Sequence, residues 1–120
     1  MNKVISFFVA GLKFGDYKKI PDFKSGESVI LRNEPENPYD PNAIELLVRK
    51  DDHSFYKLGH VPRGDTYILH AYRVAKIPLK AILFSYNLSL PTEKSALIVV
   101  NSETILDTKK DSDIPFMNLE

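Results

Sequence analysis

The chain of 120 residues contains no cysteine, which excludes disulfides, thiolate metal sites and a cysteine nucleophile. It has no apolar run near the ~20 residues that a membrane-spanning helix needs, so we expect no membrane segment. It has no excess of either charge, because 16 basic and 16 acidic residues give a net charge of zero. A global basic footprint for nucleic acid is therefore missing. The lack of cysteine is compatible with a reducing compartment, and we expect a cytoplasmic protein.

The motifs of common catalytic sites are missing as well. The sequence has no Gly-x-Ser-x-Gly, no phosphate-binding loop and no His-Glu-x-x-His. Its three histidines, His53, His60 and His70, fall on a predicted turn, a strand and a helix. Asp51, Asp52 and His53 are close in sequence, but adjacent turn residues do not easily converge on one metal ion. We therefore predict a protein that is not an enzyme and uses no cofactor and no metal.

Strand patterns separated by loop signals cover most of the chain. Runs rich in β-branched and aromatic residues predict six strands, over residues 4–10, 28–32, 43–49, 55–61, 79–86 and 96–100. The first run is too short for a typical signal peptide and is better explained as a strand. Residues 33–42 contain three prolines, which excludes a helix or a central strand there. This segment is predicted to be a long, stiff, polar loop.

One segment changes to a helical period. Apolar spacings of three and four predict a helix over residues 65–76, capped by Asp65 or Thr66 and ended before Pro78. Its predicted apolar face comprises Tyr67, Ile68, Ala71, Tyr72 and Ala75. Six strands and one helix predict a mostly β fold, a small antiparallel barrel of the OB or SH3 kind. We expect one domain over residues 1–106 and a flexible tail over residues 107–120, where charges alternate without a buried pattern.

Two segments carry aromatic and charged residues on loops, where core packing does not require them. They are Gly11-Leu12-Lys13-Phe14 and the string Asn37-Pro38-Tyr39-Asp40 within residues 34–44. A third segment, Leu58-Gly59-His60-Val61-Pro62-Arg63, lies at the end of the fourth predicted strand. A basic residue beside an aromatic, with a second aromatic and a carboxylate on a proline-bounded loop, suits the end of a polynucleotide. An ionised Asp40 would repel a phosphate, so such a groove would favour a free hydroxyl terminus.

Together these segments resemble the HIRAN domain, a family found at the N-terminus of fork-remodelling translocases and alone in bacteria. The resemblance spans about residues 4–101 and depends most on Asn37-Pro38-Tyr39-Asp40-x-Asn42-Ala43-Ile44. It implies an OB-like barrel that binds the 3′-hydroxyl end of single-stranded DNA as a targeting module in DNA repair or processing. The chain lacks the nucleotide-binding segments of a translocase, so a helicase or nuclease would be supplied by another chain.

The resemblance also implies roles for individual side chains. Phe14 and Tyr39 would stack on the terminal bases, and Asp40 would accept a hydrogen bond from the 3′-hydroxyl. Lys13-Phe14 stands where the best-known pattern has Arg-Tyr, which replaces a bidentate cation by a point charge and keeps an aromatic face.

The other implied contacts are polar. Asn37 and His60 would hold the terminal nucleotide, while Lys13 and Arg63 would contact phosphates.

Structural alternatives exist for several of these residues. Tyr39 could plug the mouth of the barrel, with Asn37 and Asp40 as turn residues that bond their own backbone. Phe14 could belong to the core, and His60 could be an ordinary strand residue. At the level of function, the alternative is a protein-interaction adaptor that binds a peptide on the same face. A flat apolar patch would favour the peptide, and a groove with basic walls would favour DNA.

Overall fold

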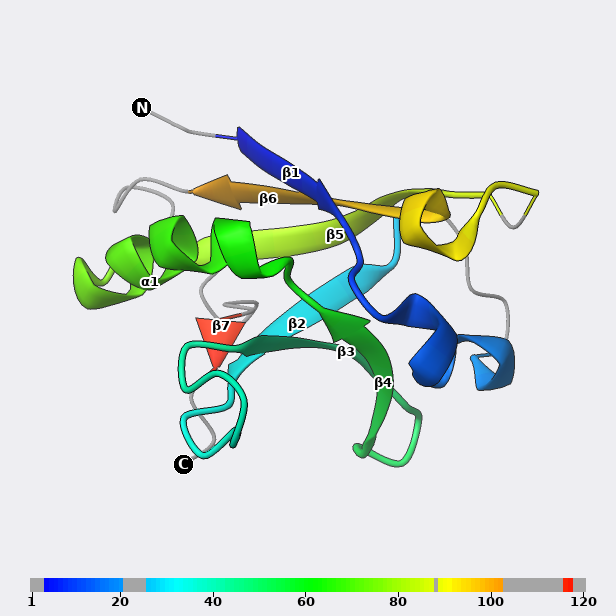
Figure 1. Cartoon of the computed structure of the whole chain (residues 1–120), viewed down its shortest axis with the longest axis horizontal. Helices are drawn as coiled ribbons and strands as arrows, with labels where there is room; N and C mark the ends of the chain where they lie inside the picture. Colours follow the sequence, from blue (N-terminus) through cyan, green and yellow to red (C-terminus); the bar gives the residue numbers. More distant parts are fainter. Residues whose placement is uncertain (1–3, 21–25, 88, 103–115, 118–120) are drawn as a thin grey trace.

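A single curled sheet dominates the computed structural model, which describes residues 4–20, 26–87, 89–102 and 116–117 (Figure 1). All six predicted strands are present, and the mostly β, antiparallel fold is confirmed. Their order in the sheet is β1-β6-β5-β2-β3-β4. The strands are β1 (Val4–Phe8), β2 (Ser28–Asn33), β3 (Ile44–Arg49), β4 (Phe55–His60), β5 (Leu79–Tyr86) and β6 (Ala96–Ser102).

The sheet curls because β2 belongs to both of its halves. Ser28 and Val29 pair with β5, whereas the following residues of β2 pair with β3. The two end strands of the order then approach each other beyond the end of β1. There Ala10 and His60 exchange both backbone hydrogen bonds, each of 2.9 Å. The sheet is therefore barrel-like, and the bridge between Ala10 and His60 joins β4 to the chain that follows β1.

Glycine is required where β1 and β4 meet. A Cβ atom on Gly59 would lie 2.5 Å from the Val9 side chain and 2.6 Å from the Ala10 carbonyl oxygen. The φ angle of Gly59 is 156°, a conformation that other residues rarely adopt. This close approach fixes the end of β4 against the chain that follows β1.

The core fills the inside of the curled sheet, as the period-two burial of β6 shows. Ala96, Ile98 and Val100 are buried, whereas the alternate residues of the strand are only partly buried. Leu58 of β4 and Leu69 of the helix are fully buried in the same cluster. Burial of such side chains stabilises a domain by ~1.5–3 kcal/mol each.

The predicted helix is present but shorter than expected. A 3-10 turn, η3 (Arg63–Asp65), leads into α1 (Thr66–Val74), and the chain leaves the helix at Lys76 with a φ of 60°. The predicted side-chain cap is wrong. Asp65 occupies the N-cap position without a side-chain cap bond, and the Thr66 hydroxyl donates instead to the Arg63 carbonyl at 3.1 Å.

The predicted buried face of this helix is correct for Ile68 and Tyr72 and wrong for Tyr67, Ala71 and Ala75. Leu69 is fully buried, and Ile68 and Tyr72 pack against the core beside it. Tyr67, expected in the core, is 73% exposed, and Ala71 is exposed as well. The helix is therefore rotated relative to the face that its apolar spacing indicated.

Three further 3-10 turns complete the described elements: η1 (Leu12–Phe14), η2 (Tyr17–Lys19) and η4 (Thr92–Lys94). Most of the predicted tail lies outside the described residues. Within it, β7 (Phe116–Met117) pairs in parallel with β2. No helix among the described residues is long and apolar enough to cross a membrane.

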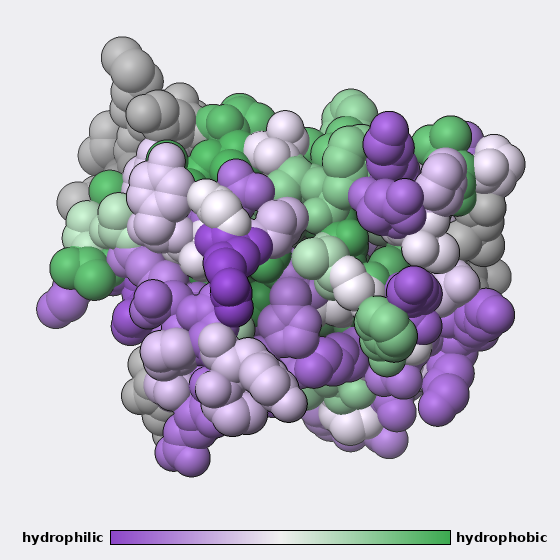
Figure 2. Space-filling view, viewed as in Figure 1, coloured by the Kyte–Doolittle hydropathy of each residue, from purple (hydrophilic) through white to green (hydrophobic). Residues whose placement is uncertain are grey.

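The surface differs between the two ends of the sheet. In the space-filling view, apolar residues gather over β1 and the strands behind it (Figure 2). The region of the β2–β3 loop, at the lower left in the same view, is hydrophilic. The part of the predicted site that lies on this loop, Asn37, Tyr39 and Asp40, is on this polar side.

Candidate nucleic-acid interface

The short turn η1 presents Phe14 to solvent. Leu12, at the start of the turn, is buried and anchors it in the core, whereas Phe14 is 82% exposed. The alternative that Phe14 belongs to the core is therefore wrong. The Lys13 ammonium lies 5.2 Å from the centre of the Phe14 ring. A cation and a free aromatic face thus occur together, as stacking on a nucleobase requires.

This turn is packed rigidly on β4. A Cβ atom on Gly15 would lie 2.7 Å from the carbonyl oxygens of both Lys57 and Leu58, so the backbones are in close contact. The Asp16 carboxylate accepts a hydrogen bond from the Lys57 backbone N–H at 3.0 Å, and the Asp16 N–H donates to the Lys57 carbonyl at 2.7 Å. These contacts hold Phe14 at a fixed place relative to β4.

A hollow of ≈220 Å³ lies between η1 and the end of β4. It is lined by Gly11, Phe14, Gly15, Lys57, Gly59 and His60. Phe14 contributes an aromatic ring to this hollow, Lys57 a cation and His60 an imidazole, while the glycines leave it open. Lys57 is an addition to the residues that sequence analysis identified.

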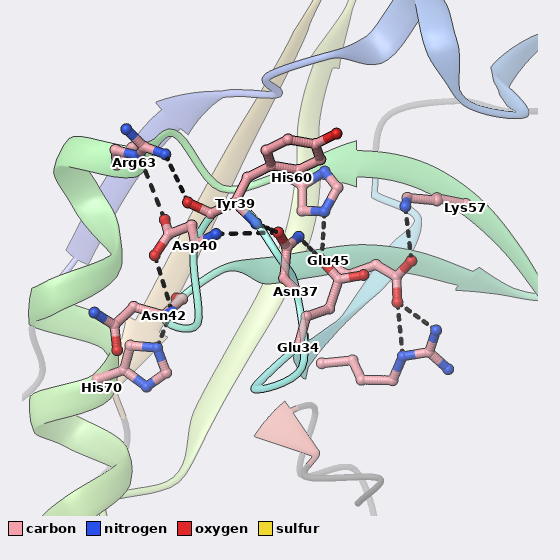
Figure 3. Close-up of polar contacts among 11 residues, drawn as sticks. Glu34, Asn37, Tyr39, Asp40, Asn42, Glu45, Lys57, His60, Arg63 and His70 are labelled. Carbon is pink, nitrogen blue, oxygen red and sulfur yellow. Dashed lines mark hydrogen bonds and ion pairs between the residues drawn. The ribbon is translucent and has the colours of Figure 1, made fainter.

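The β2–β3 loop, residues 34–43, is organised by its own polar side chains (Figure 3). The Asn37 side-chain oxygen accepts hydrogen bonds from the N–H groups of Tyr39, at 2.9 Å, and Asp40, at 3.1 Å. One Asp40 oxygen accepts from the Asn42 N–H at 2.9 Å. The turn-stabilising alternative is therefore correct for Asn37 and Asp40. It is wrong for Tyr39, whose side chain does not plug the barrel, since the residue is 88% exposed.

His60 joins this loop to β4. Its Nε2 atom lies 2.6 Å from the Glu34 carboxylate, which also accepts a hydrogen bond of 3.3 Å from the Asn37 amide. Burial raises the pKa of Glu34, but the hydrogen bond and charge of His60, with Asn37 and Lys57, outweigh it. The pKa of Glu34 is therefore lowered, which favours the ionised carboxylate beside His60.

The opposite side of the loop is held by η3 and α1. The Arg63 Nε atom forms an ion pair with Asp40 at 3.5 Å, and its terminal nitrogen donates to the Tyr39 carbonyl at 3.3 Å. His70 of α1 contacts the Asn42 carbonyl oxygen at 2.9 Å. Figure 3 shows Arg63 and Asp40 facing each other across the gap between α1 and the loop. The segment that carries Tyr39 is thus fixed from both sides.

A buried ion cluster underlies the site. Glu45 of β3 is only 3% exposed. It pairs with Arg32 of β2, whose Nε atom donates at 2.7 Å, and with the Lys57 ammonium at 3.2 Å. The sequence signal for this cluster is a glutamate within the apolar run of β3, and sequence analysis did not use it. The cluster holds Lys57 beside the glycine-lined hollow.

The structure brings the seven predicted residues into two neighbouring groups. Phe14 and His60 line the hollow, with Lys13 beside Phe14. The loop group, connected by the contacts above, comprises Asn37, Tyr39, Asp40 and Arg63. Glu34 connects the groups, because it contacts both His60 and Asn37. Among the described residues, no cluster of three or more histidine or acidic side chains could hold a metal ion.

This combination of a curled six-stranded sheet, a single α-helix and a polar loop face defines a small β-barrel-like domain with an exposed aromatic site. Residues 2–100 match the family model of the HIRAN domain. The chain belongs to the HIRAN domain family.

Two solved structures share the fold. The HIRAN domain of human HLTF is similar with a TM-score of 0.55 and 18% sequence identity, over 82% of this chain and 72% of that chain. A protein from Lactobacillus plantarum is similar with a TM-score of 0.61 and 18% identity, over 86% of this chain and 100% of that chain. No curated protein matches the sequence.

Proposed function

We propose that this HIRAN domain binds the 3′-hydroxyl end of single-stranded DNA and serves as a targeting module in DNA repair or processing. The helicase or nuclease that it targets would be another chain. The observation that carries the proposal is the exposure of two aromatic rings, Phe14 at 82% and Tyr39 at 88%, on segments connected through His60. Rings that are exposed in this way do not contribute to core packing, and they are suited to stacking on bases.

The charges around the rings fit a nucleic-acid end. Lys13, Lys57 and Arg63 would contact phosphates along the strand, although Lys57 also pairs with Glu45 and Arg63 with Asp40. Asp40 provides one carboxylate, which accepts a hydrogen bond from a hydroxyl and repels a phosphate at the same place. Asn37 supports this site from within the loop, because its oxygen is already engaged by two backbone donors.

A peptide-binding adaptor is less well supported. On the face that carries the two rings, such a site would use a flat apolar patch. The surface over the β2–β3 loop is hydrophilic instead, and Tyr39 is surrounded by charged and amide groups (Figures 2 and 3).

The test is fluorescence anisotropy with four ligands: a single strand ending in a 3′-hydroxyl, the same strand ending in a 3′-phosphate, a blunt duplex and RNA. We expect the 3′-hydroxyl strand to bind most tightly. Phe14→Ala and Tyr39→Ala should each weaken its binding about 5- to 150-fold, the equivalent of one lost stack of ~1–3 kcal/mol. Phe84→Ala is the matched control, since Phe84 is 58% exposed on β5 outside the site. Equal binding of all four ligands, or equal losses in all three variants, would refute the proposal.

A further inference from the structure

The C-terminal half of β2 has a second edge, which β5 does not cover. Ser28 and Val29 pair with β5, but the last four residues of β2 pair with β3. The Glu34 N–H donates to the Ala43 carbonyl at 2.9 Å, so the alternation of backbone directions turns Arg32 toward β3. Leu31 and Asn33 consequently present their backbone groups to the opposite edge.

The strand β7 lies at this edge. It runs parallel to β2, with Leu31 opposite Phe116 and Arg32 opposite Met117. In a parallel ladder of this register, the Met117 N–H faces the Leu31 carbonyl and the Met117 carbonyl faces the Asn33 N–H. A segment close to the end of the sequence thus meets the unpaired backbone groups of β2.

A second observation marks the same edge. Residues 32–38 line an open hollow of ≈580 Å³. The hollow begins at Arg32, which pairs with β7, so open space adjoins the edge that this extended segment occupies.

We propose that the edge of β2 at residues 31–33 is a β-augmentation site, occupied in cis by the C-terminal segment of the same chain. The 13 residues between β6 and β7 can span up to ~48 Å, more than the 39 Å longest dimension of the molecule. A tethered segment also has an effective concentration in the millimolar range, which favours it over a second copy at ordinary protein concentrations. A partner that offers an extended segment longer than the two described residues of β7 would compete with it for this edge.

The test uses the full chain and does not depend on DNA binding. Met117→Pro removes the N–H that faces Leu31, while Met117→Leu keeps that donor and is the matched control. Amide hydrogen exchange by NMR should become roughly two- to tenfold faster at Leu31 and Asn33 in Met117→Pro. Arg32 is the internal reference, because its N–H faces β3 and should not change.

A peptide of residues 113–120 provides the second measurement. Added to Met117→Pro, it should restore slow exchange at Leu31 and Asn33. Unchanged exchange in Met117→Pro, equal acceleration at Arg32, or no effect of the peptide would each overturn the proposal. Protection that increases with protein concentration would show docking between two copies and would overturn docking in cis.

Discussion

The variant Asp40→Asn tests whether Asp40 recognises the 3′ end of a strand in addition to stabilising the β2–β3 loop. Asparagine keeps an oxygen that can accept the hydrogen bond from the Asn42 N–H, which is 2.9 Å long in the structure. The change removes the negative charge that pairs with Arg63 at 3.5 Å. The Arg63 side chain is 76% exposed, so this ion pair contributes no more than ~1 kcal/mol.

The two expected magnitudes therefore differ. A loss of up to ~1 kcal/mol lowers the Tm of a domain of this size by about 5 °C or less. The repulsion between a carboxylate and a phosphate charge ~5 Å away is worth about 1–3 kcal/mol per unit charge between the surface and bulk-water dielectric limits. We expect the wild type to prefer the 3′-hydroxyl about 5- to 150-fold, and Asp40→Asn to lose most of that preference.

The assay compares anisotropy titrations of the 3′-hydroxyl and 3′-phosphate strands at one salt concentration, together with Tm. Asp52→Asn is the matched control, because Asp52 also accepts a backbone hydrogen bond, from Ser54 at 3.0 Å, and lies in the turn before β4. If Asp40→Asn rejects the 3′-phosphate as strongly as the wild type does, Asp40 does not read the end. A large drop in Tm with unchanged preference would leave Asp40 as a turn residue alone.

Two further predictions concern charge. Affinity for single strands should decrease with salt concentration, with a slope equivalent to roughly two or three phosphate contacts. Lys13→Ala or Arg63→Ala should each reduce this slope by about one contact, and should do so for every base sequence. A slope near zero would contradict this. The pKa of Glu34 is lowered in the fold, so its ionised carboxylate stabilises the fold at any pH above the ordinary pKa of 4.5. This stabilisation is lost as the pH falls below 4.5 toward the lowered pKa. When Tm is measured from neutral to acid pH, it should therefore fall less in Glu34→Gln than in the wild type. The difference should be equivalent to at most ~1 kcal/mol of stability. Identical Tm profiles for the two proteins would exclude a contribution from the Glu34–His60 contact.

The strands were predictable because their signals are local. Alternation of apolar residues and the three prolines of the β2–β3 loop act within a few residues of one another. The helix face was not predictable in the same way. Tyr67 and Leu69 both fit an apolar spacing, and the packing of α1 against the sheet decided that Leu69 is buried and Tyr67 is exposed.

The placement of the candidate site residues was predictable where it depends on single segments and not where it depends on strand register. Phe14 and Tyr39 were identified from their loops, and both are exposed. The contact of Glu34 with His60 joins residues 26 positions apart. It depends on the pairing of β3 with β4, which contains a register shift after Leu46. No local pattern in one sequence specifies that shift or the contacts that follow from it.

The structural and the functional interpretations of the β2–β3 loop are compatible. Asp40 uses one oxygen for the Asn42 N–H and the other for Arg63, but each carboxylate oxygen has two lone pairs. Asp40 can therefore accept a hydrogen bond from a hydroxyl without releasing the loop. Asn37, Arg63 and His70 meanwhile hold the backbone around Tyr39, so little order has to be imposed when a strand binds. Under the proposed function, the residues that build this turn would therefore also hold Tyr39 and Asp40 in place for the ligand.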